Sequence, residues 1–330
     1  MGHLLDIRDL SVAFDTDEGV VHAVNGVSLA IDAGESVGLA GESGCGKSVT
    51  ALSILRLTPG RVTSGRILFE GEDILSMPLP RLREIRGGAV GFVFQEPMTA
   101  LSPLHRVGAQ LAEAVALHRK MSAADTEALC LSWLKRVGIA EPERCLKAYP
   151  FELSGGMRQR VMIAMALLLE PRLIIADEPT TALDVTIQAQ ILELLREATA
   201  DGKRALLMIT HDLGVIWEMC TRVAVMYGSR LMEEAPRDEL FRNPLHPYTR
   251  ALLDAVPARQ SDPTQVKGIP GSVPSLLTPP VGCPFAPRCP KATSQCSSTL
   301  PPLRQVADGH WVACHECLRT DGETLSIRRT

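Results

Sequence analysis

The alternation of apolar and polar residues predicts strands in the first part of the chain. Residues 4–10 and 20–31 alternate in this way and are rich in β-branched side chains, as antiparallel strands are. Helical periodicity follows from residue 48 to residue 57. Short apolar strands are expected at 36–40, 66–69 and 89–94.

The pattern becomes helical from about Leu104 to Leu169. One segment in this region starts at Ser122, has Asp125 three residues later and ends at Gly138. A serine with an acidic residue three positions on favours a helix start, and a glycine favours a helix end. We therefore expect a helical subdomain over about 97–169.

Strands and helices alternate after this helical region. Buried-type strands are predicted at 173–176, 205–209 and 223–226, and helices at about 185–200 and 212–220. This alternation is typical of a mostly parallel sheet with helices on both faces. The fold class predicted is α/β.

The composition changes after about residue 255. Eleven of the 23 prolines lie between Pro257 and Pro302, and regular periodicity disappears. Proline removes backbone donors, so the pattern alone favours a disordered tail. However, the same segment holds five of the nine cysteines, Phe285 and Trp311, which disordered tails seldom collect. We expect one large domain over 1–255 and a Pro/Cys-rich C-terminal extension over 256–330.

Composition and charge narrow the class of protein. The 330 residues are 45% hydrophobic and 22% charged, which is usual for a soluble globular protein. A net charge of −4 gives no indication of nucleic-acid binding. The first residues lack the features of a signal peptide, and the longest apolar stretch, Val161–Leu169, is too short to span a bilayer. We expect a cytosolic or peripheral protein.

Residues Gly41–Ser48 read GESGCGKS, which matches the phosphate-binding pattern G-x-x-x-x-G-K-[ST]. The loop lies between a predicted strand and a predicted helix, as its chemistry requires. Glycines let backbone N–H groups turn toward phosphate oxygens, and the helix N-terminus adds partial positive charge. Lys47 is expected to reach the β- and γ-phosphates, and the Ser48 hydroxyl to bind Mg²⁺.

Two acidic residues follow the buried strand at 173–176. Strands that end at the carboxyl edge of a parallel sheet present such groups to a bound ligand. Asp177 is suited to the Mg²⁺ shell, and Glu178 is placed to polarise an attacking water.

The segment LSGGMRQR at 153–160 resembles the signature sequence of the ABC transporter ATPases. Its serine and glycines at a helix start form a second anion-binding site. Other elements resemble that family in the expected order: Gln95 the Q-loop, Thr181–Asp184 the D-loop, and His211 the switch histidine. Met157 departs from the family, which often has glutamine there.

The resemblance implies roles for specific residues. Two ATPase domains would pack head to tail, each nucleotide lying between the phosphate loop of one and the signature of the other. Catalysis would use Glu178, His211 and Lys47, and Asp184 would belong to the D-loop. Mg²⁺ would be held by Ser48, Gln95 and Asp177. The signature contacts would come from Ser154, Gly155, Gly156 and Gln159. The ATP contacts would come from Phe14, Gly41, Glu42, Ser43, Gly44, Cys45, Gly46, Lys47, Ser48, Val49, Gln95 and Asp177.

Longer stretches, including FQEPMTALSP and NPLHPYTRALL, are similar to the ATPases of oligopeptide and dipeptide importers over about residues 4–318. This resemblance implies an ATPase on the cytoplasmic face of the inner membrane. Its partners would be a second, different ATPase, two transmembrane permease subunits and an extracytoplasmic binding protein. Import of nickel, glutathione or oligosaccharides, and a non-transport role on nucleic acid or ribosomes, remain alternatives.

The cysteines of the extension are spaced Cys283-x5-Cys289-x6-Cys296-x17-Cys314. Four thiolates suit an iron–sulfur cluster or tetrahedral zinc, and a zinc site could use Cys317 through the pair Cys314-x2-Cys317. The spacing leaves both open. The family resemblance implies a [4Fe–4S] cluster on the first four cysteines.

Overall fold

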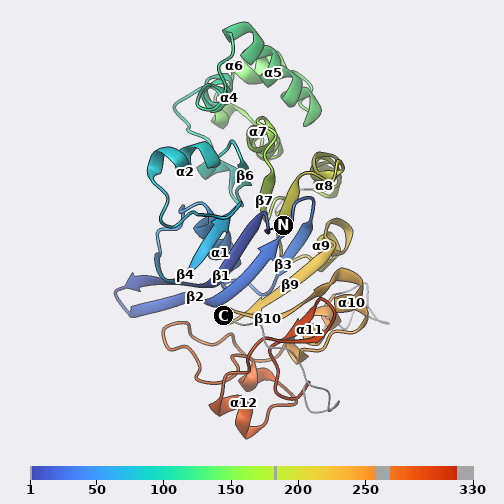
Figure 1. Ribbon diagram of the computed structural model, residues 1–330. Helices are drawn as coiled ribbons and strands as arrows, with labels where there is room; N and C mark the ends of the chain where they lie inside the picture. Colours follow the sequence, from blue (N-terminus) through green and yellow to red (C-terminus); the bar gives the residue numbers. More distant parts are fainter. Residues whose placement is uncertain (1, 182–183, 257–267, 318–330) are drawn as a thin grey trace. The chain divides into compact units, whose positions relative to one another are not determined.

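The computed structural model describes residues 2–181, 184–256 and 268–317, and the chain divides into two compact units (Figure 1). The first unit is made of residues 1–31, 36–76 and 209–330, and the second of residues 32–35 and 77–208. The phosphate loop and the cysteine-rich extension therefore belong to the same unit. Among the described residues, no helix is both long and apolar enough to cross a membrane.

The first unit contains an antiparallel sheet in the order β2-β1-β4-β5. Its strands are β1 (Leu5–Thr16), β2 (Gly19–Ile31), β4 (Arg61–Phe69) and β5 (Glu72–Asp73). The antiparallel pair predicted at 4–10 and 20–31 is confirmed. β1 continues past residue 10 to Thr16. Its register against β2 shifts between Ile7 and Ala13, which breaks the two-residue alternation on which the prediction depended.

A second set of strands in the first unit has the order β11-β12-β10-β9-β3. β3 (Ser36–Ala40) is parallel to β9 (Arg222–Tyr227), and both were predicted. β10 (Arg230–Pro236), β12 (His310–Val312) and β11 (Arg304–Ala307) add antiparallel neighbours. The sheet is therefore mixed rather than mostly parallel here. The helices of this unit's main part are α1 (Lys47–Ile54), α9 (Leu213–Met219), α10 (Arg237–Arg242) and α11 (Pro247–Asp254).

The second unit has strands in the order β8-β7-β6, with β6 parallel to β7. These are β6 (Val90–Val93), β7 (Leu173–Asp177) and β8 (Ala205–Ile209). Every residue of β7 and β8 is buried, as their apolar sequences predict. The helices are α2 (Leu79–Ile85), which was not predicted, α3 (Pro97–Ala100), α4 (Val107–Ala116), α5 (Ala123–Arg136), α6 (Pro142–Lys147), α7 (Gly155–Leu167) and α8 (Val185–Thr199), with a 3-10 turn η1 (Pro150–Glu152).

Within the region predicted to be a helical subdomain, α4, α5 and α6 are in mutual contact, and they are shown in green in Figure 1. Ser122 caps α5, because its hydroxyl accepts a hydrogen bond from the Asp125 N–H at 3.1 Å. Gly138 follows the helix with φ of +77°, a conformation that glycine adopts without strain. Both predicted ends of this helix are therefore correct to within two residues.

The extension is folded within its described residues, 268–317. It contains η3 (Ala286–Arg288) and α12 (Ser294–Ser298) as well as β11 and β12. These elements are three to five residues long, so no periodicity could show in the sequence. A buried carboxylate, Glu233 on β10, holds the extension by accepting a hydrogen bond from His310 Nε2 at 2.8 Å. It also accepts from the His246 N–H, in the main domain, at 3.0 Å.

Candidate functional site

The phosphate loop in the first unit connects β3 to α1. Gly41, Gly44 and Gly46 have φ of 147°, 76° and 104°, values that other residues rarely adopt. A Cβ on Gly41 would lie 2.2 Å from the Met226 carbonyl oxygen, and one on Gly46 would lie 2.3 Å from that of Ala23. Close backbone packing therefore requires glycine at both positions.

The Lys47 ammonium lies over this loop. Its Nζ donates to the carbonyl oxygens of Gly41 at 2.8 Å and Glu42 at 2.9 Å, and the side chain is 6% exposed. Cys45 is buried beside it, and burial raises the pKa of the thiol. A protonated, inaccessible thiol is a packing group, which agrees with its place in the motif. Ser43 and Gly44 are exposed at the tip of the loop, and Ser48 and Val49 are half-buried on α1.

Two other predicted residues belong to the first unit. Phe14 is half-buried on β1, and its ring lies close enough to Gly60 that a Cβ there would be 2.8 Å away. His211 is exposed just after β8. The next residue, Asp212, caps α9 by accepting from the Gly214 N–H at 2.8 Å, which fixes the backbone that carries the histidine.

In the second unit, Gln95 and Glu178 meet although they are 83 residues apart. Gln95 Nε2 donates to Glu178 Oε2 at 3.2 Å, and the Thr181 hydroxyl donates to the same oxygen at 2.8 Å. Glu178 has φ of +46°, an uncommon conformation for glutamate, and such strain is frequent at active sites. Asp177, just before it, is buried at the end of β7.

The signature residues lie at the start of α7. Ser154 caps the helix, accepting from the Met157 N–H at 3.3 Å, and Ser154 and Gly155 are exposed. Gln159 differs: it is buried, and its Nε2 donates to the Pro179 carbonyl at 2.7 Å. Its amide therefore ties α7 to the turn after Glu178 instead of facing solvent.

Asp184 caps α8 by accepting from the Ile187 N–H at 2.9 Å. The two preceding residues of the predicted D-loop, 182 and 183, lie outside the described residues.

Four of the five cysteines of the extension, Cys283, Cys289, Cys296 and Cys314, line one cavity of about 10 Å³, together with Phe285. Burial raises the pKa of Cys283 to about 11, and a hydrogen bond from the Cys317 thiol lowers that of Cys314 to about 6. The Cys317 sulfur also lies 2.8 Å from the Leu245 carbonyl oxygen. Within the described parts of the chain, no three His, Cys, Asp or Glu side chains are grouped to hold a single metal ion.

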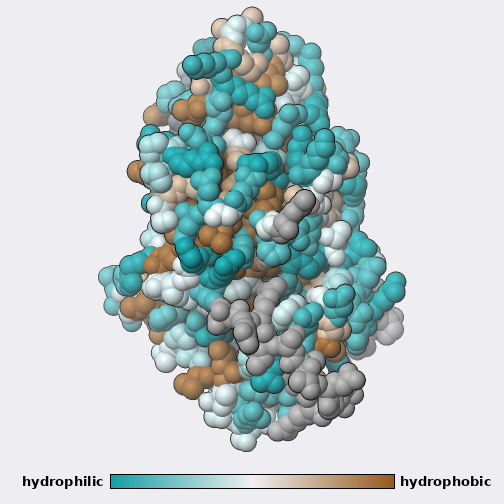
Figure 2. Space-filling view, viewed as in Figure 1, coloured by the Kyte–Doolittle hydropathy of each residue, from teal (hydrophilic) through white to brown (hydrophobic). Residues whose placement is uncertain are grey.

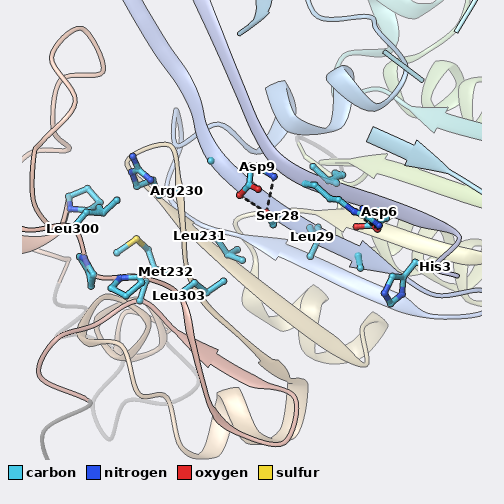
Figure 3. Close-up of a pocket in the computed structure, with 18 residues that line it drawn as sticks. His3, Asp6, Asp9, Ser28, Leu29, Arg230, Leu231, Met232, Leu300 and Leu303 are labelled. Atoms are coloured by element: carbon cyan, nitrogen blue, oxygen red, sulfur yellow. Dashed lines mark hydrogen bonds and ion pairs between the residues drawn. The ribbon is translucent and has the colours of Figure 1, made fainter. Parts of the chain in front are cut away.

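A larger cavity, of about 420 Å³, lies in the first unit among β1, β2, β10 and the extension (Figure 3). Asp9 and Ser28 form a hydrogen bond in it, and Arg230, Met232 and Leu300 lie at one end. None of the residues predicted for the site lines it.

Comparison with protein families gives two matches. The ABC transporter family matches residues 24–181, and the C-terminal region of oligopeptide/dipeptide transporters matches residues 232–296. A probable peptide ABC transporter ATP-binding protein of Sinorhizobium fredii is 51% identical over 94% of each chain. The dipeptide transport ATP-binding protein DppD of Bacillus subtilis is 47% identical over 95% of each chain. The oligopeptide transport ATP-binding protein OppD of Salmonella typhimurium is 48% identical over 94% of this chain and 93% of its own.

Solved structures of ATP-binding cassettes are also similar to this chain. A dimer of the ATP-binding cassette MJ0796 in a post-hydrolysis state, bound to ADP and phosphate, aligns with a TM-score of 0.65 and 28% identity. The alignment covers 71% of this chain and 98% of that cassette. The cbiO1 protein of Clostridium perfringens, part of the transporter complex cbiONQ, aligns with a TM-score of 0.61 and 28% identity over 74% of this chain and 92% of its own.

Proposed function

The chain belongs to the ABC transporter ATPase family and carries the oligopeptide/dipeptide transporter C-terminal region, and from this premise we propose that it hydrolyses ATP to drive peptide import. One observation carries the proposal most strongly. Relatives named as peptide transport ATP-binding proteins match along 93–95% of both chains, including the extension. The substrate class proposed is di- and oligopeptides.

The site residues divide the work of phosphoryl transfer. Lys47 Nζ would exchange its bonds to the Gly41 and Glu42 carbonyls for oxygens of the β- and γ-phosphates. Loop N–H groups would cradle the same phosphates, and Phe14 would lie against the adenine. Mg²⁺, held by Ser48, Asp177 and Gln95, would supply neutralising charge between the phosphates.

Glu178 would accept a proton or hydrogen bond from the attacking water. Its Oε2 already receives hydrogen bonds from Gln95 and Thr181, which orient the carboxylate. His211 would contact the γ-phosphate and the same attacking water. Gln95 would thus help to position Glu178, the general base.

The second half of each nucleotide site would come from a second ATPase. Ser154 and Gly155 are exposed at a helix N-terminus, so a phosphate of a partner's nucleotide could reach them. We propose a head-to-tail pair with a different ATPase chain, with Asp184 at the contact. The dimers reported for MJ0796 support this arrangement by analogy.

Membrane subunits would dock on the helical subdomain. Leu104, Leu117 and Phe151 are 80%, 73% and 63% exposed there, which is high for large apolar side chains. Figure 2 shows hydrophobic atoms among hydrophilic ones over this part of the molecule. We propose that two permeases bind this chain on the cytoplasmic face of the membrane, with a binding protein on the other side.

In cells, deletion of the gene should abolish uptake of a labelled di- or tripeptide, and re-expression should restore it. The Glu178→Gln variant, made to the same level, is the matched control and should not restore uptake. Normal peptide uptake in the deletion strain, with loss of nickel or glutathione uptake, would contradict the peptide assignment.

For the cysteines we propose a [4Fe–4S] cluster on Cys283, Cys289, Cys296 and Cys314. All four line one cavity, and Cys317 is outside that lining and lies 2.8 Å from the Leu245 carbonyl oxygen. Tetrahedral zinc requires sulfurs about 2.3 Å from one ion, whereas a cluster spreads its thiolates over several irons. Both groups take thiolate ligands, and it is the family resemblance that favours the cluster over zinc. Bound metal would supply folding energy to a segment with a small apolar core.

Anaerobically purified protein should contain about four irons per chain and absorb broadly in the visible range. Cys289→Ser should lose most of the iron, whereas Cys130→Ser, a buried cysteine of α5, should keep it. Metal analysis and a visible spectrum measure both effects. About one zinc per chain and no iron would contradict the cluster and support zinc.

A further inference from the structure

One arginine of the extension contacts the start of the phosphate loop. Arg288 ends η3, directly before Cys289. Its guanidinium donates to both carboxylate oxygens of Glu42, with Nη1–Oε2 at 2.7 Å and Nη2–Oε1 at 3.1 Å. The Arg288 side chain is 5% exposed and that of Glu42 is 24% exposed. This is a bidentate, largely buried ion pair between residues 246 positions apart.

The rest of the guanidinium is also bonded. Nη1 donates to the Tyr227 hydroxyl at 3.1 Å, Nη2 to the Ile269 carbonyl at 2.8 Å, and Nε to the Pro270 carbonyl at 2.9 Å. Arginine has five N–H donors in a fixed fork, and five hydrogen bonds are made here. The hydrogen bond to Glu42 raises the pKa of Arg288, so it stays charged. A lysine could not reproduce this geometry.

Glu42 is held on its backbone as well. Its N–H donates to the Tyr248 hydroxyl at 2.9 Å, and its carbonyl accepts from Lys47 Nζ at 2.9 Å. The residue that Arg288 fixes is therefore the one against which the phosphate-binding lysine rests.

Three aromatic rings pack together next to this contact. Tyr227 lies 4.5 Å from Tyr248 between ring centroids, and Phe285 of the extension lies 5.3 Å from each. All three are at most 1% exposed. Water is excluded from this cluster, which strengthens nearby hydrogen bonds and resists movement of the loop.

We infer that Arg288 is a positioning residue for the nucleotide loop, and that affinity for ATP depends on the extension being folded. Cys283 and Cys289 flank η3 in the sequence, and both line the same cavity. The fold around this cavity therefore sets the direction of the Arg288 side chain. The inference rests on the proposed function only in that Gly41–Ser48 binds nucleotide. It makes the extension a part of the nucleotide site.

The test measures the Kd of a fluorescent ATP analogue with Mg²⁺ on the full-length chain. Arg288→Ala should bind about tenfold more weakly, and Arg288→Lys by an intermediate factor. The KM for ATP should rise by the same factors with kcat changed far less, because Glu178 and His211, which act on the attacking water, are untouched. Arg8→Ala is the control: it removes a guanidinium bonded to Asp6 on β1, far along the chain from the loop, and should leave Kd unchanged.

A double-mutant cycle separates positioning from general damage. If Arg288 acts through Glu42, Arg288→Ala combined with Glu42→Gln should bind no more weakly than Arg288→Ala alone. Thermal melts and metal content establish that each variant is folded. Should Arg288→Ala fail to fold, Arg288→Lys decides by the same criterion.

Unchanged nucleotide Kd in a folded Arg288 variant, or an equal loss in Arg8→Ala, would overturn the inference. Failure of the wild-type chain to bind MgATP would instead contradict the proposed function, so the two failures are distinguishable.

Discussion

Replacing Glu178 with glutamine is expected to lower ATP turnover by about 10²–10⁴-fold, the usual contribution of a positioned general base. The substitution keeps the shape of the side chain and its contacts with Gln95 and Thr181 but removes the basic oxygen. Binding of MgATP should remain near that of the wild type, because the phosphate loop is unchanged. The variant should therefore hold ATP and stabilise the closed ATPase pair.

Phosphate release measures turnover, and size-exclusion chromatography with MgATP measures pairing with the partner ATPase. Glu193→Gln is the matched control, since Glu193 is exposed on α8 and forms a surface ion pair with Arg196. Turnover unchanged in Glu178→Gln would show that another group activates the water.

Lys47→Ala should weaken MgATP binding strongly. The ammonium is buried, and it donates to the carbonyl oxygens of Gly41 and Glu42 and to the Cys45 sulfur. Removing one partner of a buried charged contact costs about 2–5 kcal/mol, and each 1.4 kcal/mol is tenfold in affinity. The Kd for MgATP should therefore rise by about 30-fold to about 4 × 10³-fold.

Titration calorimetry checks this, with Lys120→Ala, an exposed lysine of the helical subdomain, as the control. A Kd for Lys47→Ala within a factor of two of the wild type would exclude the loop as the phosphate site.

Much of the fold could be predicted because its elements are long or its motifs local. The strand–loop–helix around Gly41–Ser48 and the buried strand β7 before Asp177 are contiguous in sequence, so spacing alone predicts them. The cap at Ser122 and the glycine at 138 are likewise local signals. The helical subdomain follows from the same periodicity.

The contacts between distant segments could not be predicted. β11 and β12 are only four and three residues long, and β12 pairs with β10, where Glu233 accepts a hydrogen bond from His310. The ion pair of Arg288 with Glu42 joins residues at opposite ends of the chain. No pattern in a single sequence predicts such a long-range pair, although the cysteines and aromatic residues around Arg288 indicated a folded segment.

Side-chain direction was also beyond the sequence. Gln159 lies within the signature motif, and only the fold shows that its amide is buried against the Pro179 carbonyl. Gln95 and Glu178 were predicted separately, and the fold joins them through one hydrogen bond. Periodicity gives the faces of a helix but not which loop folds over them.

The most direct test of the central claim is transport in vesicles that contain this chain, its partner ATPase and both permeases. With the binding protein and a labelled oligopeptide on the opposite side, the peptide should accumulate only when MgATP is supplied to the side of the ATPases. The same vesicles with Glu178→Gln should accumulate none. Peptide accumulation without ATP, or at full rate with Glu178→Gln, would contradict the account.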